Sequence, residues 1–71
     1  MKDFGKVKEY NGYYGKIINQ DGKDFLLLDS QIMDNQNINN SDFVTFIAEK
    51  YQNSEVNEDI ARFVKKYEKE K

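Results

Sequence analysis

Three observations predict that this chain is an all-β protein, folded as one small five-stranded antiparallel barrel. Asn11-Gly12 and Asp21-Gly22 are turn sequences, and they separate three short segments with the composition of β-strands. Residues 44–49 place apolar side chains at alternate positions, as a strand with one buried face does. The length of 71 residues allows a single domain.

The first three strands are expected at residues 4–10, 13–19 and 24–29. In each turn sequence a residue that tolerates positive φ precedes a glycine, which is the chemistry of tight hairpin turns. The three strands therefore form two hairpins with short, local connections.

The middle of the chain is polar and rich in asparagine. Residues 31–42 have Ile32, Met33 and Ile38 as their apolar anchors, so we expect a long loop that can include a helical turn. The alternation over residues 44–49 then predicts a fourth strand, with Ile47 left near the surface.

The carboxy-terminal segment fits two structures. A helical spacing, with Ser54 as a candidate cap, is present at Val56, Ile60, Phe63, Val64 and Tyr67. Residues 60–64 also suit a strand, and a five-stranded barrel needs a strand here to close its edges. We predict the strand; the alternative is a four-stranded sheet with a C-terminal amphipathic helix. The domain is expected to span residues 1–67, with 68–71 as a charged tail.

The composition excludes several kinds of chemistry. The chain contains no cysteine and no histidine, so it lacks thiolate ligands, the commonest metal ligand and the usual acid/base at neutral pH. We expect no enzymatic activity, no metal site and no cofactor. The longest apolar run, residues 25–28, is far below the ~20 residues that span a bilayer. A soluble, cytoplasmic protein without a membrane partner is therefore expected.

Charge is distributed unevenly behind the net value of -2. Residues 1–33 are balanced, residues 34–61 are strongly acidic, and residues 62–71 are basic. Proteins that bind nucleic acids usually present an excess of basic residues, because phosphate neutralisation supplies most of their non-specific affinity. Here a local basic group can be formed only by Lys6, Lys8 and Lys16, within the first two predicted strands, and by the carboxy-terminal lysines.

From residue 5 to about residue 66 the sequence resembles the bacterial cold-shock domain. Residues 5–11 (GKVKEYN) are similar to the family's opening GKVKWFN, and residues 13–17 (YYGKI) to its first ribonucleoprotein motif, GFGFI. Residues 24–32 (DFLLLDSQI) resemble the second motif, DVFVHFSxI, while 43–46 and 60–64 resemble its last two strands. The resemblance implies a five-stranded OB-type barrel that binds single-stranded RNA or DNA.

Most of the aromatic positions on which that family stacks bases differ in this chain. Among the matched positions only Tyr14 keeps a ring; the others are Glu9, Lys16, Leu26, Leu28 and Asp29. Each base stacked on a ring contributes roughly 1 to 3 kcal/mol, so their loss costs several kcal/mol of affinity. The resemblance therefore implies binding that is weaker and less specific than is usual in the family.

Two functions follow as expectations, both for a protein that we expect to be a monomer. The first is weak, low-specificity binding of single-stranded RNA or DNA by Lys6, Lys8, Tyr14, Lys16, Leu26 and Leu28, with Tyr10 and Tyr13 at the margin of the surface. The alternative is a protein-interaction or accessory module, in which Tyr14, Leu26 and Leu28 are apolar anchors and Glu9 and Asp29 form a charged rim. A purely structural role for Leu26 and Leu28, buried under the 31–42 loop or the C-terminal segment, is also open.

Overall fold

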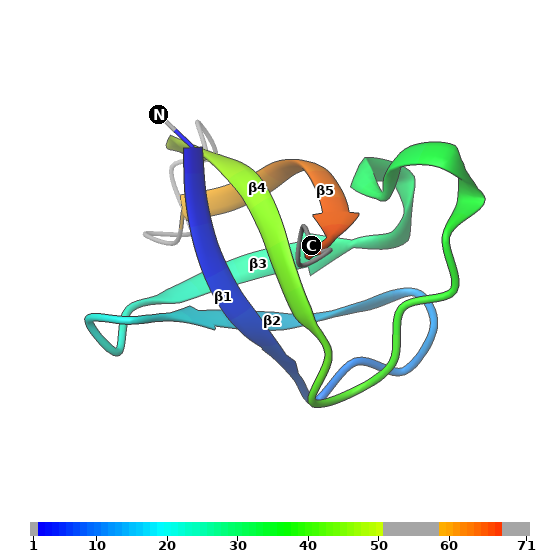
Figure 1. The fold of residues 1–71 in the computed structure, drawn as a ribbon, viewed down its shortest axis with the longest axis horizontal. Helices are drawn as coiled ribbons and strands as arrows, with labels where there is room; N and C mark the ends of the chain where they lie inside the picture. The colour runs from blue at the N-terminus through cyan, green and yellow to red at the C-terminus, as the bar shows by residue number, and fades with distance from the viewer. Residues whose placement is uncertain (1, 51–58, 68–71) are drawn as a thin grey trace, which may run out of the picture.

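The computed structural model describes residues 2–50 and 59–67, and these form a closed barrel (Figure 1). It has five strands: β1 (Lys2–Lys8), β2 (Tyr14–Asn19), β3 (Asp24–Leu28), β4 (Phe43–Lys50) and β5 (Asp59–Lys66). The predicted all-β fold is confirmed. The expected charged tail, residues 68–71, lies outside the described residues.

The strands follow one another around the barrel in the order β1-β2-β3-β5-β4, and β4 closes on β1. Four of the five neighbouring pairs are antiparallel. The fifth pair, β3 with β5, is parallel and short, with Phe25 opposite Asp59 and Leu26 opposite Ile60. The barrel is therefore mixed rather than purely antiparallel, and it is consistent with a small OB-type barrel.

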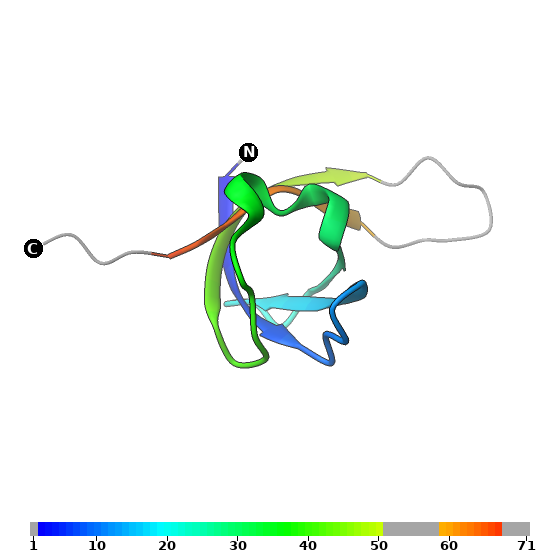
Figure 2. The same cartoon turned by 90° about the vertical axis from the view of Figure 1, so that its right-hand side faces the viewer.

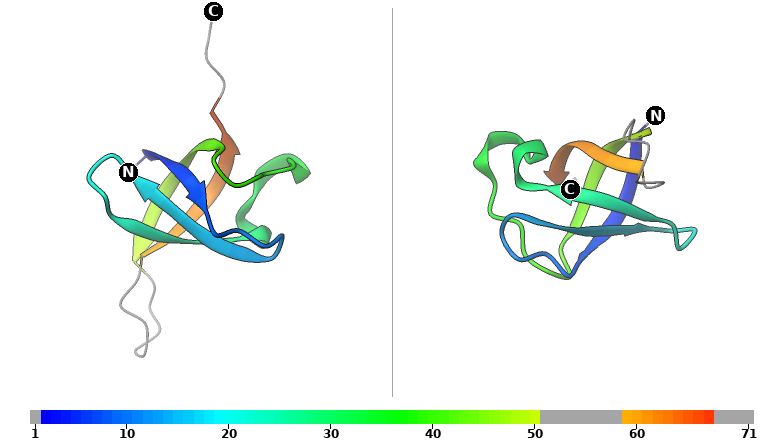
Figure 3. Two further views of the ribbon diagram at one scale, coloured as in Figure 1. Left: turned by 90° about the horizontal axis from the view of Figure 1, so that it is seen from below. Right: turned by 180° about the vertical axis from the view of Figure 1, so that it is seen from behind.

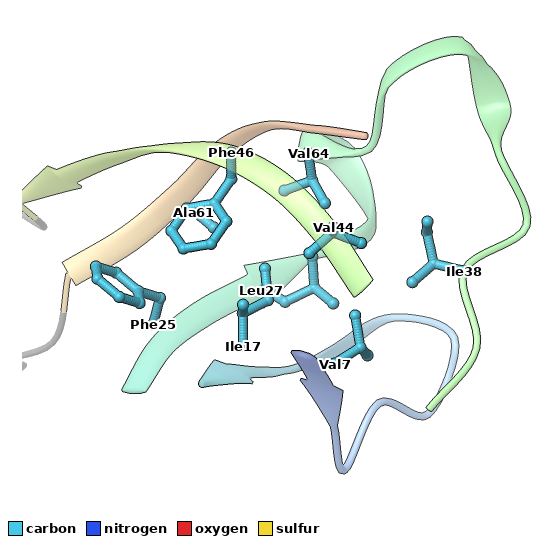
Figure 4. Packing of buried hydrophobic residues seen from close by; sticks show 9 residues of the cluster. All are labelled: Val7, Ile17, Phe25, Leu27, Ile38, Val44, Phe46, Ala61 and Val64. Carbon is cyan, nitrogen blue, oxygen red and sulfur yellow. The ribbon is translucent and has the colours of Figure 1, made fainter. Parts of the chain in front are cut away.

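The core is built from inward-pointing residues of all five strands, alternate in β2, β3 and β4, together with one residue of the loop before β4 (Figure 4). Its members are Val7, Ile17, Phe25, Leu27, Ile38, Val44, Phe46, Ala61 and Val64. The rings of Phe25 and Phe46 pack at 4.9 Å between centroids, which joins β3 to β4 across the interior. Because side chains alternate along a strand, the same residues fix which side chains face outward.

The loop between β3 and β4 crosses one end of the barrel (Figure 2). It contains two single 3₁₀ turns, Asp29–Gln31 and Met33–Asn35, so the long loop with a helical turn is confirmed. Ile38 enters the core from this loop, and Gln36 Oε1 accepts a hydrogen bond from the backbone N–H of Lys66. The loop thus covers the barrel end through one apolar and one polar anchor.

The first hairpin connection, residues 9–13, is longer than its turn sequence predicts, whereas the second, residues 20–23, has the expected length. β1 ends at Lys8, not at residue 10, because Glu9 adopts a positive φ of 56° and leaves the strand. Asn11 Oδ1 then accepts hydrogen bonds from the N–H groups of Tyr13 and Tyr14, which orders the connection. Gly22 has the positive φ expected for the second turn.

The carboxy-terminal segment is a strand over its described residues. β5 pairs with β4 and β3, so the helical alternative is wrong for residues 59–66. A bulge beside the register shift between Thr45 and Ile47 places Phe63 at a positive φ of 54° and leaves it exposed. Ser54 and Val56 lie outside the described residues. Within the ranges 2–50 and 59–67, no helix is long and apolar enough to cross a membrane.

Candidate functional site

β1, β2 and β3 are neighbours in the barrel wall (Figure 3, left), and the strand register brings the predicted site residues of these three strands together on its outer surface. Lys8 is opposite Lys16 across β1 and β2, and Lys16 is opposite Leu26 across β2 and β3. Two residues from Lys16 toward the start of β2, Tyr14 is opposite Leu28 of β3. Two residues from Lys16 toward the end of β2, Ile18 is opposite Lys6 of β1. We call this surface the β1–β3 face; its residues are Lys6, Lys8, Tyr14, Lys16, Ile18, Leu26 and Leu28.

The side chains of this face differ in their access to solvent. Tyr14 is 59% exposed, and its ring is available to a ligand. Leu26 and Leu28 are half-buried. The sequence left two alternatives for them, exposed apolar anchors or fully buried structural residues, and their exposure is between the two. Leu26 gains part of its cover from its position beside Ile60 of β5, which is itself buried.

The three lysines of the face have different electrostatic surroundings. Lys16 Nζ lies 3.8 Å from Glu9 Oε2, so the Glu9 carboxylate pairs with a lysine that is a candidate to bind phosphate. Lys6 Nζ lies 5.7 Å from the ring centroid of Phe43. Lys8 is exposed, and among the described residues it takes part in no salt bridge. A phosphate would therefore meet the least competition at Lys8.

The two marginal tyrosines are placed differently. Tyr13 lies in the β1–β2 connection, directly before Tyr14 in the chain, and is 71% exposed. Tyr10 instead packs against the core, and its backbone crosses Gly15 so closely that a Cβ there would lie 2.5 Å from Tyr10 Cα. Burial, with a smaller contribution from Asp29, raises the pKa of Tyr10 above its usual 10.0. As a partly buried neutral phenol, Tyr10 contributes to packing.

An aromatic group that the sequence analysis did not assign to the site adjoins this face. Phe4 and Phe43 are stacked, with centroids 5.4 Å apart and planes 2° apart, and Tyr67 meets Phe4 edge-on at 4.9 Å. Phe43 and Tyr67 are each about half exposed. The alternation of side chains along each strand could have identified Phe4 and Phe43 as outward residues. Their proximity depends on the pairing of β1 with β4.

Other chemistry is less well supported by the described part of the chain. It holds no group of three or more acidic, histidine or cysteine side chains that could bind a metal ion. Asp59, an acidic residue near the β4–β5 connection, pairs with Lys23 at 2.7 Å. In the turn between β2 and β3, Asn19 Oδ1 accepts hydrogen bonds from the backbone N–H groups of Asp21 and Lys23. This oxygen therefore stabilises the hairpin.

No protein-family model matches the chain, and no curated protein matches it. The functional argument therefore depends on the site itself.

Proposed function

We propose that the β1–β3 face binds single-stranded RNA or DNA weakly and with low sequence specificity, as a reduced form of a cold-shock-like surface. One observation carries the proposal: the strand register places the exposed ring of Tyr14 on the same outer surface as Lys16, two residues along β2, and Lys8, which is opposite Lys16. A ring that stacks on a base, beside cations that pair with the flanking phosphates, is the combination that sequence-tolerant binding of single strands requires.

The same surface explains why the binding is expected to be weak. Tyr14 is the one aromatic ring at a position matched to the cold-shock motifs, and a single stacked base contributes about 1 to 3 kcal/mol. Glu9 competes with phosphate for Lys16 through their 3.8 Å ion pair. Asp29 is exposed at the end of β3 and adds a second negative charge beside Leu28. Low specificity follows, because a base stacked on a ring is not identified by its edge.

A salt titration of the intact protein with an oligothymidylate tests the proposal through the phosphate contacts. Three lysine–phosphate contacts predict a slope of about -2 for log K against log salt, since each contact on a single strand contributes about -0.7. Lys8→Glu is expected to weaken binding and to make the slope shallower. The matched control is Lys65→Glu, which changes an exposed lysine of β5 outside the β1–β3 face. Equal losses in both variants would contradict a site on the β1–β3 face.

The alternative function is binding of a protein partner through the same face. It is supported by the exposed rings of Tyr13 and Tyr14, and by the acidic rim of Glu9 and Asp29. Half-burial of Leu26 and Leu28 leaves it fewer apolar anchors than the sequence indicated. Absence of oligonucleotide binding at low salt would favour this alternative, because an apolar contact does not depend on phosphate.

A further inference from the structure

The aromatic group next to the β1–β3 face borders a groove. A hollow of about 440 Å³ runs over the outer side of β1, lined by Phe4, Lys6, Lys8, Ile18, Gln20 and Phe43 among others. This volume lies within the range of about 300 to 1,000 Å³ that is usual for small-molecule sites. Phe43 stacks on Phe4 and is 49% exposed, so a large part of its surface is open to a ligand.

The groove and the β1–β3 face share the same cations. Lys6 and Lys8 belong to the face and also line the groove. Lys6 Nζ lies 5.7 Å from the centroid of Phe43, so this ring has a lysine beside it. The ring of Tyr14 likewise has Lys16 on the same face, two residues along β2. The order across the sheet is therefore ring, lysines, ring.

Strand geometry gives the separation of the two rings. Phe43 is opposite Lys6, and Lys8 is opposite Lys16, two residues from Tyr14. Tyr14 and Phe43 thus lie two strands and four residues apart, a distance of about 16 Å along the sheet. A strand of several nucleotides can reach both rings, since single-strand sites on barrels of this size cover about 4 to 16 nucleotides.

We infer that the groove bordered by Phe43 is a second base-stacking site, which takes a nucleobase from the same single strand that stacks on Tyr14. The inference rests on the proposed function and extends it across β1 to β4. Lys6 and Lys8 bind the phosphates between the two bases. Gln20, exposed at the end of the groove, offers an amide to the edge of the base.

The charges around the groove favour a nucleic acid over a second copy of this chain. In a symmetric dimer the same patch meets itself, so the lysines of one copy would face those of the other. A phosphate backbone instead complements those lysines while its bases occupy the rings. The same surface therefore matches the charge and the aromatic character of one ligand class.

The test compares two oligothymidylates, of about six and about two nucleotides, on the intact protein. Wild type is expected to bind the longer oligonucleotide more tightly, because only this ligand can reach both rings. Phe43→Leu keeps an apolar side chain against Phe4 but removes the ring, so affinity for the longer ligand should fall at least about fivefold. In Phe43→Leu the advantage of the longer oligonucleotide should largely disappear.

Phe63→Leu is the matched control, because Phe63 is 57% exposed on β5 and does not line the groove. Circular dichroism and urea unfolding of both variants establish that the barrel is intact, and Phe43→Trp, which restores a ring, should recover binding. If Phe43→Leu binds the longer oligonucleotide as tightly as wild type does, the inference of a second stacking site at Phe43 is wrong. Tyr14 would then be the stacking residue of the proposed surface. Failure of wild type to bind either oligonucleotide would overturn the second site and the proposed function together.

Discussion

The inner and outer surfaces of β2 and β3 carry side chains of opposite character on the same two strands. Inward positions hold Ile17, Phe25 and Leu27, each at most 2% exposed. Outward positions hold an exposed tyrosine, a lysine and two half-buried leucines. Adjacent residues of one strand therefore have different tasks, and a shift of register by one residue would exchange them.

The difference teaches that stability and binding can be altered separately in this barrel. Substitution of an inward residue removes contacts from a core that a domain of 71 residues can hardly replace. Substitution of an outward residue changes charge or stacking while the core remains packed. The largest effects are therefore expected on the inner surface.

Neighbouring leucines of β3 provide the sharpest comparison. Leu27 is completely buried, so Leu27→Ala should lower the free energy of unfolding by about 2 to 5 kcal/mol. Leu28 is half-buried on the outer surface, and Leu28→Ala should cost about 1 kcal/mol. Urea denaturation of the two variants measures both values. Equal losses would mean that the outer surface of β3 is packed like the core.

A smaller effect is expected where the inner surface admits no side chain at all. Gly15 lies under Tyr10, and a Cβ there would meet backbone atoms at 2.5 Å, so Gly15→Ala should cost about 1 to 3 kcal/mol. Gly12→Ala is the control: its Cβ would meet nothing within 4 Å, although its φ of 98° still disfavours alanine. In thermal unfolding, the melting temperature of Gly15→Ala should be lower than that of Gly12→Ala. The reverse order would contradict the close approach of Tyr10 to Gly15.

The smallest effect is expected on the outer surface, as a gain of binding. Glu9→Gln removes the partner of Lys16 and one negative charge, so affinity for an oligothymidylate should rise about two- to fivefold, the range of a surface ion pair. Stability should change little, because the ion pair is at the surface, with 43% of the Lys16 side chain and 67% of the Glu9 side chain exposed. Glu49→Gln, which removes the partner of Arg62 on the far side of the barrel, is the control. Equal gains in both variants would indicate a general charge effect instead of a site at Lys16.

Much of the β1–β3 face could be predicted from the sequence, because it depends on local rules. The parity of β2 and β3 placed Tyr14, Lys16, Leu26 and Leu28 on one side, and the structure has them there. The end of β1 was wrong by two residues, since the positive φ of Glu9 is set by the following connection and by contacts with the loop at Asn40. Tyr10 left the face for the same reason. The aromatic pair of Phe4 and Phe43 was missed because their positions are far apart in the chain.

By itself the sequence determined the hairpin sites, the alternation of inner and outer side chains and the absence of cysteine and histidine chemistry. The first two depend on neighbours within a few residues, where turn preference and strand periodicity act directly, and the third follows from composition. Tertiary structure alone decided that residues 59–66 are a strand, since their spacing also suits a helix and only pairing with β4 and β3 separates the two. It also decided the parallel β3–β5 contact, the half-burial of Leu26 beside Ile60 and the groove at Phe43. These features join distant segments, and their free energy comes from closing the barrel, which no local pattern contains.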